Sequence, residues 1–121
     1  MTDCTFYSLQ NSHGTAKPAK RQGFSDGTFY YYQFPETDVW YAIVPEIGMS
    51  IVSGNSLHQV SRLAHLPTNM RRLHEYKMSA SYRLDMRKFA DLCDEAGVYP
   101  YDEPALESLD LLFAGGDVYG S

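Results

Sequence analysis

The sequence has few of the features that mark secreted, membrane-spanning or metal-binding proteins. Only Cys4 and Cys93 are cysteines, and they lie far apart in the chain of 121 residues. No apolar run approaches the roughly 20 residues that a membrane-spanning helix needs. Residues 1–10 lack the basic start and apolar stretch of a signal peptide. We therefore expect a soluble cytoplasmic protein, with no membrane partner, whose cysteines are free thiols.

Basic residues are scarce and unevenly placed. The formal net charge is −5, which argues against a chain that neutralises nucleic-acid phosphates over its whole surface. Residues 61–88 hold seven Lys and Arg residues against two acidic ones, whereas residues 89–121 hold eight acidic residues and no Lys or Arg. These two segments can attract each other within one fold or face different partners. The alternative is that both form ordinary solvated helix faces.

Hydrophobic and aromatic residues are present in amounts that can form one folded domain. Hydrophobic residues make up 44% of the chain and aromatic residues 14%, ten of them tyrosines. A chain of this length and composition can fill one core, so we expect a single domain over residues 1–121. Tyrosine combines an apolar body with a polar tip, which suits partly buried positions and interfaces.

Strand-forming runs in the first half predict a small antiparallel sheet of three to four strands. Residues 10–27 are rich in Gly, Pro, Ser and Asn, which predicts a loop or mobile arm between the first two strands. Pro45 and Gly48 mark a bend before the last strand. The candidate strands are "CTFYSL" (4–9), "TFYYYQF" (28–34), "VWYAIV" (39–44) and "MSIVS" (49–53).

About four short helices are predicted to follow the sheet and cover it, which gives an α+β fold. Ser56 and Gln59 have the spacing of a capping box, and apolar residues then recur at helical spacing until Pro67. Thr68 or Asn69 can cap a second helix. Residues 78–84 alternate between apolar and polar side chains, which favours a further strand, although a helix-loop interpretation stays open.

Two more helices are predicted toward the C-terminus. The apolar residues between Asp85 and Gly97 lie on one helical face, which predicts a helix. Asp85 can cap its start, and Gly97 suits its end. Asp102 and Pro104 indicate another start. A flexible tail is expected over about 114–121. The buried side of the last helix is predicted to hold Leu106, Leu109, Leu112 and Phe113.

The stretch "YAIVPEIGMSIVSGNSLHQVSRLA" resembles the N-terminal part of HicB-type antitoxins. The likeness is carried by Val44-Pro45-Glu46, Gly48 and Gly54-Asn55-Ser56, and it covers roughly residues 28–66. The resemblance implies a partial ribonuclease-H-like fold that sequesters a small RNA-cleaving toxin, often with a DNA-binding appendage. The second proline that the family usually has before the turn glycine is missing, and "LHQVSRLAH" replaces its acidic helix.

No group of side chains predicts catalysis or a bound cofactor. The histidines His58 and His65 can lie on one side of a helix, yet no pair has the short spacing typical of metal ligands. Cys93 belongs to an apolar stripe beside Asp94 and Glu95, so we expect a buried structural thiol with a raised pKa. We therefore expect a protein that is not an enzyme, with no metal and no cofactor.

The preferred hypothesis is a small non-catalytic inhibitor or regulator that binds a protein with a basic surface. Compact acidic proteins with few motifs include antitoxins and phage-encoded anti-CRISPR proteins. Consecutive tyrosines on a strand alternate between its faces, so at least one should face a partner, unless all of them cover the open sides of the sheet. We expect Tyr31→Ala with Asp110→Lys to weaken binding without unfolding the domain. The predicted contact residues are Tyr30, Tyr31, Tyr32, Tyr99, Tyr101, Asp102, Glu103, Glu107 and Asp110.

The alternative hypothesis is a DNA-binding transcriptional regulator that uses a basic helix pair over residues 56–77. Arginine side chains on a helix can contact phosphates or guanine edges. Pro67 stands where a helix-turn-helix usually has a glycine turn, and the chain as a whole is acidic. A homodimer also stays open. The predicted nucleic-acid contacts are Arg62, Arg71, Arg72 and Lys77.

Overall fold

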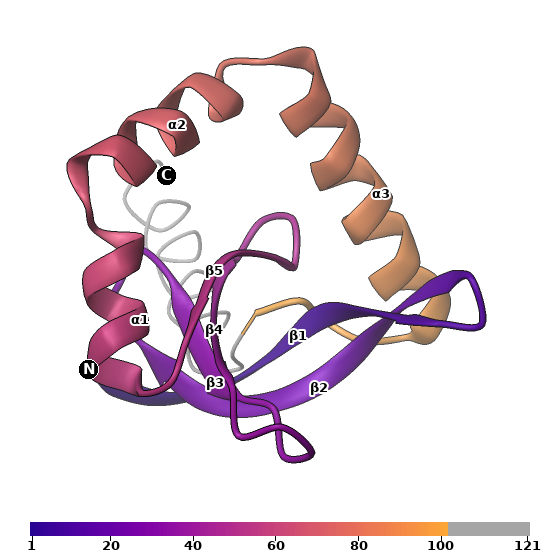
Figure 1. Ribbon diagram of the computed structural model, residues 1–121. Helices are drawn as coiled ribbons and strands as arrows, with labels where there is room; N and C mark the ends of the chain where they lie inside the picture. The colour runs from indigo at the N-terminus through magenta and orange to yellow at the C-terminus, as the bar shows by residue number, and fades with distance from the viewer. Residues whose placement is uncertain (102–121) are drawn as a thin grey trace, which may run out of the picture.

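The computed structural model describes residues 1–101 and shows a five-stranded antiparallel sheet followed by three helices (Figure 1). The α+β class is therefore confirmed, with one strand more than expected. The predicted fourth helix and the tail after it lie outside the described residues. The elements are β1 (Thr2–Ser12), β2 (Thr15–Ser25), β3 (Tyr30–Gln33), β4 (Trp40–Val44), β5 (Met49–Gly54), α1 (Leu57–Ala64), α2 (Pro67–Lys77) and α3 (Ala80–Ala96).

The prediction of a loop over residues 10–27 is wrong, because β1 and β2 form one long hairpin. The two strands pair from Thr2↔Ser25 to Ser12↔Thr15. His13 and Gly14 make the turn with φ values of 52° and 80°, as two-residue hairpin turns require. Composition was misleading here because a tight turn needs only two residues, and the paired backbone then tolerates polar and small residues on either side.

Pro18 is compatible with the hairpin because the backbone N–H of Leu9, the residue opposite it, points away from β2. Pro18 lies opposite Leu9, and Leu9 N donates to the carbonyl oxygen of Gly48 at 2.8 Å instead of bonding across the hairpin. The hairpin therefore does not need the N–H that proline lacks. The same bond joins β1 to the turn between β4 and β5, so the hairpin bends back over the sheet.

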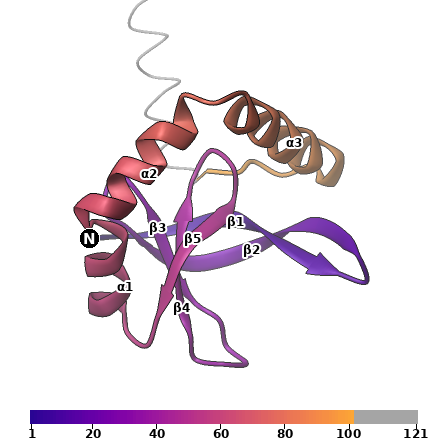
Figure 2. The ribbon, with the colours of Figure 1, turned by 45° about the horizontal axis from the view of Figure 1, so that its top comes forward.

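The bend of the hairpin depends on a close approach between β2 and β3. Only Phe24↔Tyr31 and Ser25↔Tyr30 pair these strands. A Cβ atom at Gly23 would lie 1.8 Å from the backbone oxygen of Tyr31, so only glycine fits there. Figure 2 shows the hairpin extending past the other strands toward α3, and β2 contacts that helix.

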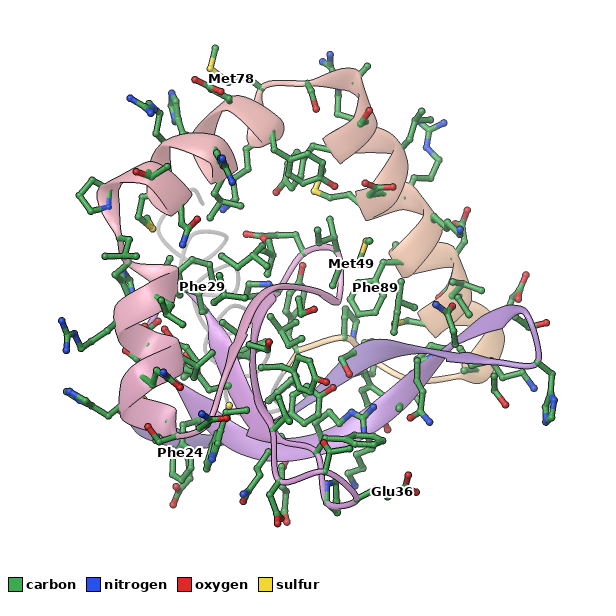
Figure 3. The ribbon with its side chains drawn as sticks, viewed as in Figure 1. Phe24, Phe29, Glu36, Met49, Met78 and Phe89 are labelled. Atoms are coloured by element: carbon green, nitrogen blue, oxygen red, sulfur yellow. The ribbon has the colours of Figure 1, made fainter. Side chains whose placement is uncertain are left out.

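The central strands β3 and β4 are covered on both faces, and each face has its own apolar cluster. One cluster joins Phe29 and Tyr31 to Val60 and Ala64 of α1 and to Leu73 of α2. Figure 3 shows Phe29 between the strands and the helices. Phe6 of the hairpin lies on the other face, where its ring stacks on Tyr30 with centroids 4.5 Å apart. The remaining core members of that second face are Tyr32 and Ile43.

The helix boundaries confirm some capping predictions and correct others. Ser56 Oγ accepts a hydrogen bond from Gln59 N at 3.0 Å, as predicted, while Gln59 Oε1 accepts from Asn55 N at 2.6 Å. Gly97 ends α3 with a φ of 69°, also as predicted. The second helix begins at Pro67 itself, and Asn69 Nδ2 donates to Leu63 O instead of capping.

The favoured strand over residues 78–84 is wrong, because these residues contain the start of α3. Ser79 is the N-cap, and its Oγ accepts from Tyr82 N at 3.3 Å. Asp85 therefore lies inside the helix, where it accepts a hydrogen bond from the Tyr76 hydroxyl. An alternating run of apolar residues can also lie in a helix if some of them are exposed. Here Tyr82 and Met86 pack against the core, whereas Leu84 is exposed.

The order strand, turn, strand, helix expected for residues 28–66 is present in β3, β4, β5 and α1. This order is a common local solution for a small sheet covered by a helix, so it does not establish ancestry. The resemblance to HicB-type antitoxins accordingly stays a prediction.

Candidate functional site

The tyrosines of β3 do not form a binding surface. Tyr31 is fully buried, and Tyr30 and Tyr32 each keep 8% of their surface exposed. The three side chains do alternate between the faces of the sheet, but the helices cover one face and the β1–β2 hairpin covers the other. The expectation that at least one of them faces a partner is therefore wrong.

The other predicted protein contacts are only partly described. Tyr99 is 70% exposed and follows the end of α3. Tyr101 is half-buried and packs against the cluster around Phe6, and burial together with Glu46 raises its pKa. The predicted acidic contacts Asp102, Glu103, Glu107 and Asp110 lie outside the described residues.

The three helices carry several exposed basic side chains, alongside exposed acidic ones at the end of α3. Arg62 follows Val60 by two residues and Arg71 precedes Leu73 by two, so both point away from the core. Figures 1 and 3 show the helices following one another in an arc, with nitrogen-tipped side chains on its outer side. Arg83 and Arg87 lie on the side of α3 that also faces Glu46, and Lys88 lies beside Asp85 toward the hairpin. We use the name basic helical surface for all the exposed Lys and Arg side chains of the three helices, whichever side they face: Arg62, Arg71, Arg72, Arg83, Arg87 and Lys88.

None of these six side chains forms an ion pair with any of residues 1–101. Lys77, the fourth predicted nucleic-acid contact, differs from them because its Nζ lies 3.7 Å from Glu46 Oε1. Arg62 on α1 and Arg71 and Arg72 on α2 are thus exposed on consecutive helices, whereas Lys77 is turned toward Glu46 in the turn between β4 and β5. Sequence reasoning did not assign Arg83, Arg87 and Lys88 to the site, because the predicted basic helix pair ended at residue 77.

The acidic net charge of the chain does not come from the part that carries the basic helical surface. All ten Lys and Arg residues lie within residues 1–101, together with ten of the fifteen acidic residues, so this part has a formal charge of zero. Residues 102–121 contribute the whole net charge of −5. The electrostatic objection to a phosphate-binding surface therefore applies to the chain as a whole and not to the described residues.

A polar junction at Asp26 fixes α1 to the sheet. Asp26 Oδ1 accepts from the backbone N–H groups of Thr28 and Phe29 at 2.9 and 2.8 Å. Its Oδ2 accepts from the Tyr31 hydroxyl at 2.5 Å and lies 2.7 Å from His65 Nε2. Burial opposes ionisation of this carboxylate, but the four hydrogen bonds outweigh it and lower its pKa to about 2.

The Asp26 junction is a structural contact between distant segments. His65 follows the last residue of α1, so the hydrogen bond ties the end of that helix to the turn between β2 and β3. Burial and the neighbouring carboxylate raise the pKa of the Tyr31 hydroxyl, although Ser61 acts in the opposite direction. Sequence reasoning singled out His65 only for its spacing from His58, because nothing in the sequence marks Asp26 as its partner.

A second tyrosine–carboxylate bond joins α2 to α3. The Tyr76 hydroxyl donates to Asp85, and burial followed by this hydrogen bond raises the pKa of Tyr76. The Tyr76 ring also packs edge-on against Tyr82, with centroids 5.4 Å apart. These contacts hold the two helices in their arc and so set the spacing of the basic side chains that they carry.

The cysteines and histidines take part in no metal-ligand cluster in the part of the chain that the structure describes. Cys4 and Cys93 are not joined by a disulfide, as predicted. Cys93 is buried, and burial followed by Asp94 raises its pKa, as predicted. Within residues 1–101, no three His, Cys, Asp or Glu side chains lie together as a metal site requires.

Comparisons of the chain with protein-family models, curated proteins and solved structures gave no match. None of the three described helices is both long and apolar enough to cross a membrane.

Proposed function

We propose that this protein is a non-catalytic nucleic-acid-binding protein that contacts the phosphate backbone through the basic helical surface. The observation that carries the proposal is the exposure of six Arg and Lys side chains on α1, α2 and α3 with no ion-pair partner among residues 1–101. Such side chains release counterions when they neutralise phosphates, and this release drives binding regardless of base sequence.

Two structural facts favour this function over the protein-binding hypothesis preferred from the sequence. The tyrosines of β3 were the main aromatic contacts in that hypothesis, and they are buried. The net charge of −5 was the main argument against nucleic acid, and it belongs to residues 102–121. The part of the chain that carries the basic helical surface therefore has no net negative charge to repel a polyanion.

Binding of a fluorescent DNA duplex tests the proposal directly. Arg71→Glu with Arg72→Glu should weaken binding and reduce the slope of log affinity against log salt by about 2, roughly one for each lost phosphate contact. An RNA duplex of the same sequence shows whether the surface distinguishes the two polymers.

The matched control is Lys17→Glu with Lys20→Glu, which makes the same charge change at two exposed positions of β2. This control should bind as the unaltered protein does. Equal loss in both variants would mean that only the net charge matters, and unchanged binding in the Arg71 and Arg72 variant would refute the proposal.

A second candidate function is the inhibitor or regulator that binds a protein, including an antitoxin-like one. Met78 and Leu84 favour it, because they remain 74% and 63% exposed beside the basic helical surface. Figure 3 shows Met78 pointing away from the molecule between α2 and α3. Large exposed apolar side chains are enriched at protein interfaces.

Affinity capture from the native host separates this candidate from the first. Met78→Asp with Leu84→Asp should abolish capture of a specific protein while leaving DNA binding unchanged. A protein captured equally by both forms would exclude these two residues as its contacts.

A further inference from the structure

A mostly apolar groove of about 470 Å³ lies along α3. Met86 and Ala90 contribute its helical side, and Tyr101 lines it from the segment that follows the helix. The last described residue is therefore part of the groove itself, and the chain continues from there with residues 102–121. Any segment that begins at Asp102 starts next to the groove and needs almost no linker to enter it.

Two polar features of the groove indicate what would fit it. Arg83 and Arg87 line it one helical turn apart, and neither forms an ion pair with residues 1–101. Glu46 also lines it, and its Oε2 is buried without a hydrogen-bond partner in the described part of the chain. A buried acceptor without a donor is costly. The groove therefore suits an apolar segment that carries carboxylates for the arginines and an N–H or O–H donor for Glu46.

The sequence after Tyr101 has this character. Its acidic residues have no Lys or Arg between them, and its apolar residues recur at the spacing of one helical face. Covalent attachment beside the groove also raises the effective concentration of this segment far above that of a separate partner. The acidic residues are Asp102, Glu103, Glu107 and Asp110, and the apolar residues are Leu106, Leu109, Leu112 and Phe113.

We propose that residues 102–113 of the same chain occupy this groove. The leucines contact Met86 and Ala90, and the carboxylates pair with Arg83 and Arg87. The docked segment covers two members of the basic helical surface, so it acts as an internal competitor for nucleic acid. The docking does not depend on the proposed function, whereas the competition rests on it.

Hydrogen exchange of the full-length protein, followed by mass spectrometry, tests the docking without nucleic acid. Amides within residues 105–113 should exchange slowly in the unaltered protein, because docking protects them. Ala90→Trp fills the groove from an exposed helix position and should make these amides exchange rapidly. Ala80→Trp, at an exposed position of α3 outside the groove, should leave them protected. Rapid exchange in the unaltered protein, or equal protection in both variants, overturns the proposal.

A charge exchange tests the pairing itself. Arg83→Glu with Arg87→Glu should speed exchange within residues 105–113, and Glu107→Arg with Asp110→Arg added to it should restore protection. Failure of the combined variant to restore protection overturns the assigned pairing. Protection that is lost on dilution would show that a second copy supplies the segment, and would overturn docking within one chain.

The same variants separate this inference from the proposed function. If the docked segment competes, Leu109→Ser with Leu112→Ser should increase affinity for the DNA duplex severalfold. Unchanged affinity with lost protection overturns the competition and leaves the docking intact. If no form of the protein binds DNA or RNA, the proposed function fails, while the exchange data still decide the docking.

Discussion

The sheet and the helices of this protein differ in where their characteristic side chains lie. Tyr30, Tyr31 and Tyr32 give β3 an unusual aromatic run, and all three are buried. Arg71 and Arg72 of α2 belong to a sequence typical of an ordinary solvated helix. Both are exposed and have no ion-pair partner among residues 1–101. The aromatic run therefore stabilises the fold, and the basic helices are the better candidate for binding.

The comparison teaches that a residue's chemistry predicts function only after its exposure is known. A tyrosine can serve an interface or a core, because its ring is apolar and its hydroxyl needs one partner. Tyr31 finds that partner within the fold, in Asp26. An arginine on a helix face opposite the core has no such alternative, because burying its charge without a partner costs several kcal/mol. Four stability measurements can break or sharpen this contrast.

The largest effect is expected for Tyr31→Ala. Removing this fully buried ring leaves a cavity between the sheet and α1, and such truncations cost about 3–5 kcal/mol. This replaces the earlier expectation that the change would spare the fold. Urea unfolding measures the loss, and Tyr31→Phe, which keeps the ring, should lose less than half as much. A loss below about 1 kcal/mol for alanine would contradict the packing seen here.

A smaller effect is expected for Asp26→Asn, and it should depend on pH. The pKa of Asp26 is about 2 in the fold against a usual 3.8, so its ionised form contributes about 2 kcal/mol of stability at neutral pH. Because the folded pKa is the lower one, this contribution is present above pH 3.8 and is lost as the pH falls toward 2.

Urea unfolding at a series of pH values checks the Asp26 prediction. The difference between the unaltered protein and Asp26→Asn should shrink through that acidic window. Asp38→Asn changes an exposed aspartate in the turn after β3 and serves as the control. A difference that stayed constant with pH would show that the carboxylate's charge contributes nothing at this junction.

The next effect is expected for Ser79→Ala. Ser79 Oγ caps α3 at Tyr82 N and also donates to Tyr76 O at 2.6 Å. Loss of such a cap costs about 1 kcal/mol. Thermal unfolding measures it, and Ser81→Ala, at an exposed position inside the helix, should not destabilise the protein. Equal behaviour of the two variants would argue that residues 78–84 do not begin a capped helix.

The smallest effect on stability is expected for Arg71→Glu with Arg72→Glu. Both side chains are exposed and make no ion pair with the described residues, so the free energy of unfolding should change by about 0.5 kcal/mol or less. The same urea series measures it. A large loss would mean that these arginines stabilise the fold, and their effect on DNA binding could not then be assigned to direct contact.

Most of the fold was predictable where local signals agreed with the tertiary environment. The strand formers around Tyr31 and Ile43, the cap at Ser56 and the stop at Gly97 each specify one backbone conformation, and each is found in the structure. The β1–β2 hairpin was not predicted because the Gly, Pro, Ser and Asn residues of 10–27 indicated a loop, whereas only His13 and Gly14 form the turn. The start of α3 was missed because its first turn is only partly buried, which blurs the helical period.

The candidate site was less predictable than the fold. Arg62, Arg71 and Arg72 were identified from the cluster of basic residues, which is a local property of the sequence. Their lack of ion-pair partners among residues 1–101 depends on which acidic residues the fold brings near, and no local pattern reports that. The contact of His65 with Asp26 spans 39 positions and follows only from the packing of α1 on the sheet.

The sequence by itself determined the α+β class, the three-strand unit with its following helix, and the separation of basic from acidic segments, because these depend on neighbouring residues. The tertiary structure alone decided which side chains are available. The returning hairpin covers one face of the sheet and the arc of helices covers the other, so the tyrosines are removed from solvent and the arginines are left in it. Exposure is set by contacts between segments far apart in the chain, and for that reason it could not be deduced from local patterns.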